Sequence, residues 1–317
     1  MSRIHEALRR AEQERAASQS AQRTEESGEF NAATGLIDTV APSPVISTPP
    51  ISQPAIVPQS KTESIPEALQ FDNLWANCTR AKWKPNHNLL LFGDSNPFNP
   101  GTEPFRTLRS RLYRIRDSQP VQTVLITSAI PAEGKTLVAT NLAYALARQQ
   151  GSRVLLIDAD IRSPRSHVLL GAPPTPGLAD YLQGGRSEME VIQRGFDVGL
   201  CFIPAGNHVT HPAELISSQR LKGLLERLKP AFDWIIIDSP PALPVADAAV
   251  LARSCDGVLF VVRANTTPSE TSQKACKDLR DAHILGVVLN TVEETTQYGT
   301  YYSNTPYGLP PASKSKK

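Results

Sequence analysis

The sequence predicts an α/β fold in which helices cover both faces of a parallel β-sheet. Two observations support this prediction. From residue 101 onward, short apolar runs rich in β-branched residues alternate with stretches of helical periodicity, and these runs are apolar at nearly every position. A strand without a polar side is buried on both faces, which is typical of parallel sheets with helical connections. We therefore expect one α/β domain over residues 101–290.

Six apolar runs are the expected strands, and four amphipathic stretches between them are the expected helices. The strands are expected at residues 121–127, 153–158, 199–203, 234–238, 257–262 and 284–290. The helices are expected at residues 137–149, 215–228, 245–252 and 270–282.

A short helix is predicted for residues 2–17, ahead of this domain. Ser2 is a suitable N-cap, and Ile4, Leu8 and Ala11 recur near helical spacing. Short isolated helices are marginal in water. The segment is therefore either a solvated helix or one that gains stability by docking on a surface.

Residues 18–100 are predicted to be a mostly disordered linker rich in Pro and Ser. Six prolines lie between Pro42 and Pro58 among Ser, Thr and Gln, and such a segment buries too little apolar surface to offset its ordering entropy. Trp75 and Trp83, near its end, either pack locally or await a partner. Residues 291–317 are polar and are predicted to form a flexible tail.

Composition excludes several classes of protein. The 33 Lys and Arg against 31 Asp and Glu give a net charge of +2, without the basic excess expected of a nucleic-acid-binding protein. The four cysteines form no CxxC pair, which argues against a disulfide scaffold or a cysteine zinc site and favours a reducing compartment. No run of 18 apolar residues and no secretory signal is present, so we expect a cytoplasmic chain without its own membrane span.

The first expected strand leads into a phosphate-binding pattern. Ala129 is followed by four residues and then by Gly134, Lys135 and Thr136, and a helical stretch begins there. Successive N–H groups of such a loop surround phosphates, and the helix dipole adds positive potential. Lys135 is expected to reach the β- and γ-phosphates, and Thr136 to bind Mg²⁺. The expected loop residues are Ala129, Ile130, Pro131, Ala132, Glu133, Gly134, Lys135 and Thr136.

Acidic residues end two of the later strands. VLLIDADIR places Asp158 and Asp160 at and just after a strand end, and WIIIDSPP places Asp238 at another. Ligands of open parallel sheets bind beyond the carboxyl ends of the strands. Magnesium there takes one or two carboxylates together with phosphate oxygens. The expected metal ligands are Thr136, Asp158 and Asp238.

These three motifs together resemble those of the bacterial tyrosine kinases of exopolysaccharide synthesis. That family carries a Walker A loop, a second apolar-DxDxR motif and a Walker B motif, which correspond to AIPAEGKT, LLIDADIR and IIIDSPP. The resemblance implies ATP and Mg²⁺ as cofactors and a catalytic role for Lys135, Asp158, Asp160 and Asp238. Either Asp158 or Asp160 would accept the tyrosine proton.

Two further features fit the same resemblance. Glu103, Arg106 and Arg109 have ExxRxxR spacing on one helix face, which in the family contacts the neighbouring subunit of a ring. Four of the seven tyrosines lie within ten residues of the tail, where the family is phosphorylated by a neighbouring copy. They are Tyr298, Tyr301, Tyr302 and Tyr307.

The remaining expectations concern the surroundings of the site and its partners. Arg263 and Asn290, at two strand ends, are candidates for the neighbourhood of the nucleotide base, and His208 and His211 are interpreted as loop histidines. The resemblance implies activation by a membrane-spanning chain-length regulator. We expect it as a separate protein that places this homo-oligomer at the inner membrane.

Two alternative functions are retained. Partitioning and division-site ATPases share the sheet and the loop, but usually carry a second lysine early in the loop, where this chain has Ile130. A nucleotide-binding scaffold of a secretion complex is the other alternative. The full set of Lys135, Thr136, Asp158 and Asp238 argues against a purely structural role.

Overall fold

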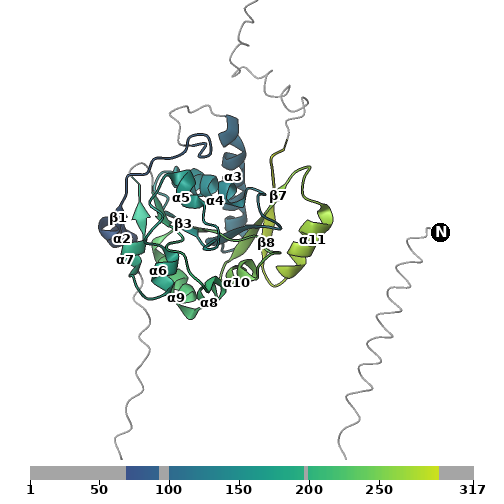
Figure 1. Ribbon diagram of the computed structural model, residues 1–317. Coiled ribbons are helices and arrows are strands. Elements are labelled where there is room, and N and C mark those ends of the chain that lie inside the picture. The colour runs from purple at the N-terminus through teal and green to yellow at the C-terminus, as the bar shows by residue number, and fades with distance from the viewer. Residues whose placement is uncertain (1–68, 93–99, 196–198, 293–317) are drawn as a thin grey trace, which may run out of the picture. The chain divides into compact units, whose positions relative to one another are not determined.

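The computed structural model describes residues 69–92, 100–195 and 199–292 (Figure 1). In these residues eight strands form one sheet in the order β1-β4-β5-β3-β6-β2-β7-β8. Every neighbouring pair is parallel except β4 and β5. The strands are β1 (Thr79–Arg80), β2 (Thr123–Ser128), β3 (Val154–Asp158), β4 (Gln193–Arg194), β5 (Leu200–Ile203), β6 (Trp234–Asp238), β7 (Gly257–Arg263) and β8 (Ile284–Asn290).

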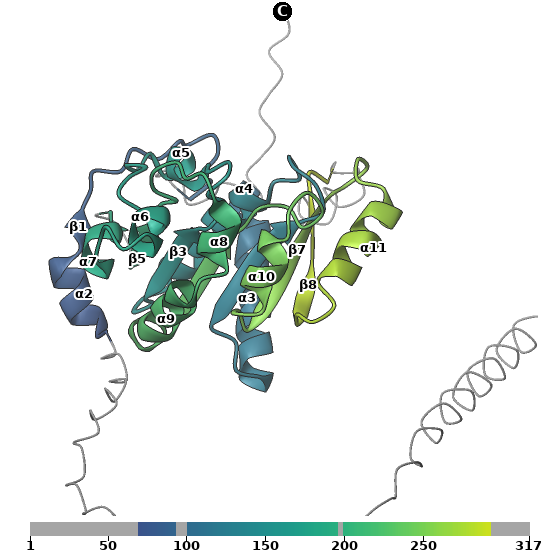
Figure 2. The ribbon, with the colours of Figure 1, turned by 60° about the horizontal axis from the view of Figure 1, so that its bottom comes forward.

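Helices cover both faces of this sheet (Figure 2). One core cluster joins strand residues such as Val124 and Ile236 to α3 (Glu103–Ser118) and α4 (Lys135–Ala147). A second cluster joins the alternate strand residues, such as Leu125 and Ile237, to helices on the opposite face. Those helices are α6 (Leu178–Leu182), α9 (Gln219–Leu228), α10 (Asp247–Ala252) and α11 (Ser269–Asp278).

The remaining helices of the described residues are short connections. They are α2 (Phe71–Asn77), α5 (Ser166–Leu170), α7 (Glu188–Val191), α8 (Pro212–Ile216) and the 3₁₀ turns η1 (Pro100–Thr102) and η2 (Lys229–Ala231).

The predicted fold class is confirmed, and the six predicted strands begin and end within two residues of β2, β3 and β5–β8. The helix expected at residues 215–228 is two helices, because α8 ends at Ile216 and α9 begins at Gln219. The Ser217 hydroxyl donates to the Ala213 carbonyl and the Ser218 hydroxyl to the Leu215 carbonyl. Such side-chain bonds compete with helix continuation, and the serine pair separates the two helices.

The described part of the predicted linker, residues 69–92, corrects the boundary expected at residue 101. In this segment Leu74 and Leu90 are fully buried, β1 pairs with β4, and Trp83 packs edge-on against Phe202 and donates to Gln193. Residue exposure alternates around Ala81, which is buried between exposed Arg80 and Lys82. β1 itself has two residues, both exposed, so the sequence offers no apolar run there from which a strand could be predicted.

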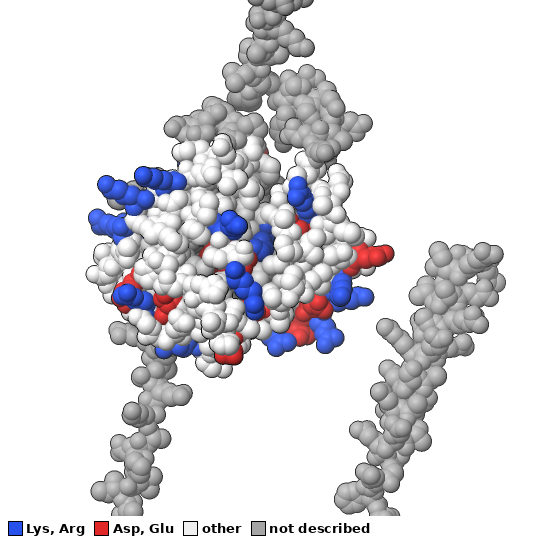
Figure 3. Space-filling view, in the orientation of Figure 1, with Lys and Arg blue, Asp and Glu red and all other residues white. Residues whose placement is uncertain are grey.

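Both tryptophans of this segment therefore pack locally. Trp75 stacks on Phe71 with ring centroids 5.4 Å apart, and Phe71 meets Phe232 edge-on at 5.7 Å. Arg80, Lys82 and Lys84 of this segment are exposed. On the face shown in Figure 3, Lys and Arg gather at the upper left. The segment is thus apolar toward the sheet and basic toward solvent.

Three predicted features lie outside the described residues. They are the helix at residues 2–17, the linker at residues 18–68 and the tail at residues 293–317 with its four tyrosines.

We predict that Leu74→Ala lowers the free energy of unfolding by about 2–5 kcal/mol, because a leucine side chain is removed from a fully enclosed position. Leu289, which is 62% exposed on β8, is the matched control, and Leu289→Ala should change stability by less than about 0.5 kcal/mol. Urea denaturation followed by tryptophan fluorescence measures both. Equal effects of the two substitutions would show that residues 69–92 are not part of the folded domain.

Candidate nucleotide site

The loop between β2 and α4 has a backbone that only particular residues allow. Ala132 and Gly134 both have positive φ, of 66° and 93°, and Gly134 is the N-cap of α4. A Cβ atom on Gly134 would overlap the side-chain amide of Asn290, which donates to the Glu133 carbonyl at 2.9 Å. Glycine is therefore required here both by the left-handed conformation and by the close approach of β8.

The Glu133 side chain ties this loop to the segment after β7. It is 2% exposed and accepts hydrogen bonds from the Ile130 N–H (2.7 Å), the Thr267 hydroxyl (2.6 Å) and the Arg263 N–H (3.3 Å). Arg263 and Asn290, predicted to surround the nucleotide base, are thus brought to the loop by contacts with Glu133. Whether they touch a base stays a prediction.

Lys135, the first residue of α4, lies among the acidic residues expected from the sequence. Its ammonium group donates to Asp160 Oδ2 at 2.8 Å and lies 3.4 Å from the Thr136 hydroxyl. The lysine side chain is 13% exposed and the Asp160 side chain 5%. A nearly enclosed ion pair of this kind depends on both partners, since removal of either leaves a buried charge.

Asp158 and Asp238 end neighbouring strands at the same level of the sheet. They are register partners in the β3–β6 pair, and both are fully buried. Ser166, the first residue of α5, joins them, because its N–H donates to Asp158 and its hydroxyl donates to Asp238, both at 3.1 Å. The other Asp238 oxygen, Oδ1, has no hydrogen-bond partner.

Burial sets the protonation of this cluster. It raises the pKa of Asp238 to about 6, against the opposing charge of Lys135. Burial and the Asp238 charge raise the pKa of Asp158 well above its ordinary value. Burial alone would lower the pKa of Lys135, but the charges of Asp238 and Asp160 outweigh it and raise that pKa. The site therefore carries surplus carboxylate that a cation would satisfy.

Three residues of this region were missed by sequence reasoning. Asp247, at the start of α10, receives the Nε–H of Arg162 at 2.7 Å and a second guanidinium hydrogen bond at 3.2 Å. Ser166 and Thr267 make the contacts described above. Ser166 follows Asp158 closely at a helix start, but Asp247 and Thr267 are distant in sequence from their partners and carry no signal.

The ExxRxxR residues lie on α3, away from the loop. Glu103 and Arg106 form an ion pair, and Arg109 donates to the Ala145 carbonyl of α4 at 2.8 Å. Within one chain, the Arg109 side chain is thus bound to the last turn of α4. Its predicted contact with a neighbouring subunit stays a prediction.

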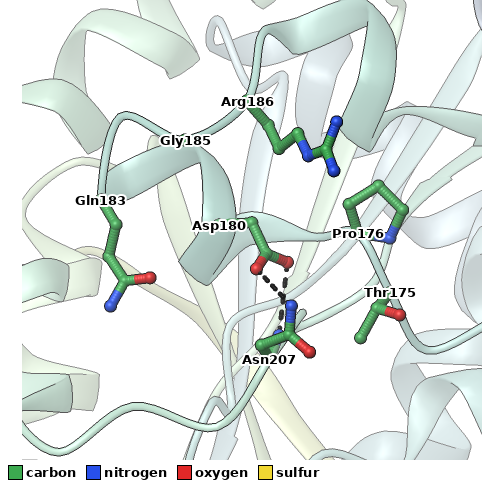
Figure 4. A pocket seen from close by; sticks show the side chains of 7 residues that line it. All are labelled: Thr175, Pro176, Asp180, Gln183, Gly185, Arg186 and Asn207. Carbon is green, nitrogen blue, oxygen red and sulfur yellow. Dashed lines mark hydrogen bonds between the residues drawn. The ribbon is translucent and has the colours of Figure 1, made fainter.

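A separate cavity of about 230 Å³ lies near α6 (Figure 4). Asp180 points into it and accepts from the Asn207 amide at 2.6 Å and from the N–H groups of Gly177 and Asn207. No buried unpartnered polar atom lines it, in contrast to the site around Asp238. Its lining residues are Thr175, Pro176, Asp180, Gln183, Gly185, Arg186 and Asn207.

Comparison with known proteins identifies similar chains. A family model described as an AAA domain matches residues 126–279. The tyrosine-protein kinase YwqD of Bacillus subtilis is 35% identical over 211 residues, which cover 65% of this chain and 89% of YwqD. The tyrosine-protein kinase Etk of Escherichia coli is 34% identical over 248 residues, or 76% of this chain and 33% of Etk. This chain thus spans about a third of the length of Etk.

Comparison with solved structures also identifies similar chains. The kinase domain of the Escherichia coli tyrosine kinase ETK superimposes with a TM-score of 0.60 at 34% identity, covering 64% of this chain and 80% of that domain. The chimerical protein CapA2B2 gives a TM-score of 0.61 at 28% identity, covering 70% of this chain and 98% of that protein. No helix among the described residues has the length and apolarity needed to cross a membrane.

We predict that Asp238→Asn raises the melting temperature of the nucleotide-free protein at pH 7.5. The native pKa near 6 exceeds the ordinary value of 3.8, so the native state binds more protons than the unfolded state between these values. The contribution of Asp238 to stability therefore falls as pH rises through this window, by about 1–3 kcal/mol. Calorimetry at pH 5 and pH 7.5 measures the effect.

Asp233 is the matched control of opposite sign. Burial acts to raise its pKa, but its hydrogen bonds with Arg153 outweigh this and lower the pKa, so its ionised form stabilises the native state. Asp233→Asn should therefore lower the melting temperature at pH 7.5. A lower melting temperature for both variants would contradict the surplus of carboxylate at the site.

Proposed function

This chain belongs to the bacterial tyrosine-protein kinases, and we propose that it uses ATP and Mg²⁺ to phosphorylate the tyrosine cluster of its own tail in another copy. Through this phosphorylation it would regulate the synthesis and export of an exopolysaccharide. The observation that carries the proposal is the buried group of Lys135, Asp158, Asp160 and Asp238 at the phosphate loop, in which the Asp238 Oδ1 atom lacks a partner.

A magnesium ion fits the donors present. Among the described residues, no three His, Cys, Asp or Glu side chains are grouped as a metal cage. Magnesium keeps several waters and uses one or two carboxylates together with substrate phosphates, so it does not require such a cage. Thr136, Asp158 and Asp238 would hold the ion. The Asp238 Oδ1 atom, which accepts no hydrogen bond among the described residues, would be available to the ion.

Lys135 is in position to exchange its partner. It is now paired with Asp160, and a triphosphate in the loop would offer it a stronger anion. That exchange would release the Asp160 Oδ2 atom, while Oδ1 still accepts from the Ser163 N–H at 3.1 Å. Asp158 is fully buried and accepts from two backbone N–H groups, of Asp160 and Ser166. Asp160 is therefore the better of the two candidates to accept the proton of the incoming tyrosine.

Bound ATP and Mg²⁺ would supply the phosphoryl group and neutralise its developing charge, which is most of what catalysis of this transfer requires. The loop N–H groups would orient the phosphates. Glu133 holds the loop against the segment after β7, which would limit its movement during transfer.

The tail begins next to this site. Asn290, the last residue of β8, contacts the loop through Glu133. The first tyrosine of the tail, Tyr298, follows eight residues later, a distance that an extended chain spans in about 27 Å. We propose that a homo-oligomer, such as a ring with Glu103, Arg106 and Arg109 in its interface, delivers each tail to the neighbouring site.

The proposed setting is the cytoplasmic side of the inner membrane. A separate membrane-spanning chain-length regulator would activate the kinase and hold it there. The residues before 69, which include the predicted linker, would let the kinase domain contact this regulator or another component of the assembly.

We predict that wild-type protein incubated with ATP and Mg²⁺ acquires phosphate on Tyr298, Tyr301, Tyr302 and Tyr307. Lys135→Met should reduce the rate by roughly 10²–10³-fold, as expected when a charge that stabilises the transition state is lost. Lys222→Met, on an exposed position of α9, is the matched control with unchanged activity. Mass spectrometry of the tail peptide measures the phosphate.

Transfer between copies is tested by mixing two variants. One carries Lys135→Met with intact tyrosines, and the other carries all four tyrosines changed to phenylalanine with an intact loop. Phosphate should appear on the Lys135→Met copy only in the mixture. Hydrolysis of ATP with no tyrosine modified, with the activating partner present, would instead favour the partitioning-type ATPase.

Phosphorylation should also loosen the oligomer. Each phosphotyrosine adds about −1.5 to −2 charges, so four add roughly −6 to −8 beside a neighbour's carboxylate-rich site. We expect light scattering to report smaller particles after full phosphorylation than before. Particles of unchanged size would exclude this form of regulation.

A further inference from the structure

Arg162 and Asp247 form an ion pair between two loops that border the phosphate-binding loop. The Arg162 Nε–H donates to Asp247 Oδ2 at 2.7 Å, and a second guanidinium nitrogen donates to Asp247 Oδ1 at 3.2 Å. The Asp247 side chain is 2% exposed and the Arg162 side chain is 36% exposed. An enclosed carboxylate of this kind depends on its cation, because removal of the cation leaves a buried charge without a partner.

Arg162 lies in a tight turn that begins at Asp160. The Ser163 N–H donates to the backbone carbonyl of Asp160 at 3.2 Å and to its side-chain Oδ1 atom at 3.1 Å. The Asp160 N–H donates to Asp158 Oδ1 at 3.2 Å. The direction of the Asp160 carboxylate is therefore set by the conformation of residues 160–163, and Arg162 ties this turn to the start of α10.

Asp247 follows the loop after β6, and that loop is bonded to the start of the phosphate loop. The Ala242 N–H donates to the Ser128 carbonyl at 2.8 Å, and the Leu243 N–H donates to the Ala129 carbonyl at 3.2 Å. The ion pair therefore connects the turn to the chain segment that holds the first residue of the phosphate loop.

Nucleotide binding would change what holds the turn. On the proposed function, a triphosphate draws Lys135 away from Asp160, and the ion pair between these two residues is lost. The pair between Arg162 and Asp247 would remain, together with the hydrogen bonds of the turn and the packing of Ile161, which is 5% exposed. The nucleotide-bound state therefore depends more on this pair than the nucleotide-free state does.

We propose that Arg162 and Asp247 are positioning residues for phosphoryl transfer, which keep the Asp160 carboxylate aimed at the tyrosine hydroxyl after Lys135 has moved to the phosphates. This inference rests on the proposed function and adds two residues to it. Proton transfer depends steeply on geometry, and a displacement of about 1 Å costs roughly 10²-fold in rate. The pair should therefore act on kcat and leave the KM for ATP almost unchanged.

A second two-pronged ion pair in the domain provides the comparison. Arg153 precedes β3 and donates to Asp233 at 2.8 Å and 3.3 Å, with side chains 40% and 30% exposed. Both residues lie at the amino ends of β3 and β6, whereas Asp158 and Asp238 lie at the carboxyl ends of these strands. The two pairs share their chemistry and differ in the edge of the sheet that they join.

The test measures the initial rate of tail phosphorylation by the full-length protein over a range of ATP concentrations with Mg²⁺. Arg162→Met and Asp247→Asn should each lower kcat by roughly 10–100-fold, since the general base is displaced. The KM for ATP should change by less than about 2-fold, because binding of the nucleotide is not affected. The control Arg153→Met should retain the wild-type kcat.

Two further variants separate positioning from folding. The double variant of Arg162→Met and Asp247→Asn should be about as slow as the slower single variant, because residues that act as one unit have non-additive effects. Arg162→Lys keeps the charge but loses the two-pronged geometry, so its rate should lie between those of wild type and Arg162→Met. Should Asp247→Asn fail to fold, the two variants of the partly exposed Arg162 decide.

Three results would contradict the positioning role in an active wild type. They are an Arg162→Met variant with unchanged kcat, a raised KM for ATP without loss of kcat, and an equal loss of kcat in Arg153→Met. A wild type that transfers no phosphate to tyrosine, with the activating partner present, would instead overturn the proposed function and this role with it.

Discussion

The buried charge group at the carboxyl edge of the sheet is the constraint on which the rest of the structure depends. One lysine faces three carboxylates there, and two of these, Asp158 and Asp238, are entirely removed from water. Such an arrangement is unfavourable in the nucleotide-free chain, since burial and mutual repulsion raise the pKa of both aspartates. On the proposed function, the stability given up at this site would become binding energy when a cation and a phosphate chain complete the charge balance.

The surrounding fold holds this group in place against its own repulsion. Parallel pairing of β3 and β6 brings the two aspartates to the same level, and Ser166 donates to both. The loop is fixed from the other side by Glu133, which accepts from Ile130 and Thr267, and by the amide of Asn290. Asp158 and Asp238 thus come from the ends of central strands and Lys135 from the start of α4, whereas β7, β8 and α5 supply supporting hydrogen bonds.

The edge of the sheet formed by β1 and β4 is stabilised in a different way. There β4 lies between the short β1 and β5, parallel to β1 and antiparallel to β5. Aromatic packing of Phe71, Trp75 and Trp83 takes the place of long backbone ladders. The Arg194 guanidinium lies over the Trp75 ring at this edge, 4.3 Å from its centroid. With only two paired residues, the β1–β4 ladder contributes fewer backbone pairs than the ladders at the centre of the sheet.

Local patterns in the sequence predict six of the eight described strands, the helical layers and the phosphate loop, because apolar runs, helical periodicity and the GKT pattern each lie within a few residues. They also place Lys135, Asp158, Asp160 and Asp238 together, since parallel strands end at one edge. The sequence does not predict that residues 69–92 pack into the domain, or that Ser166 and Asp247 support the site. Each of these depends on contacts between segments distant in sequence, and residue spacing along one chain carries no record of such contacts.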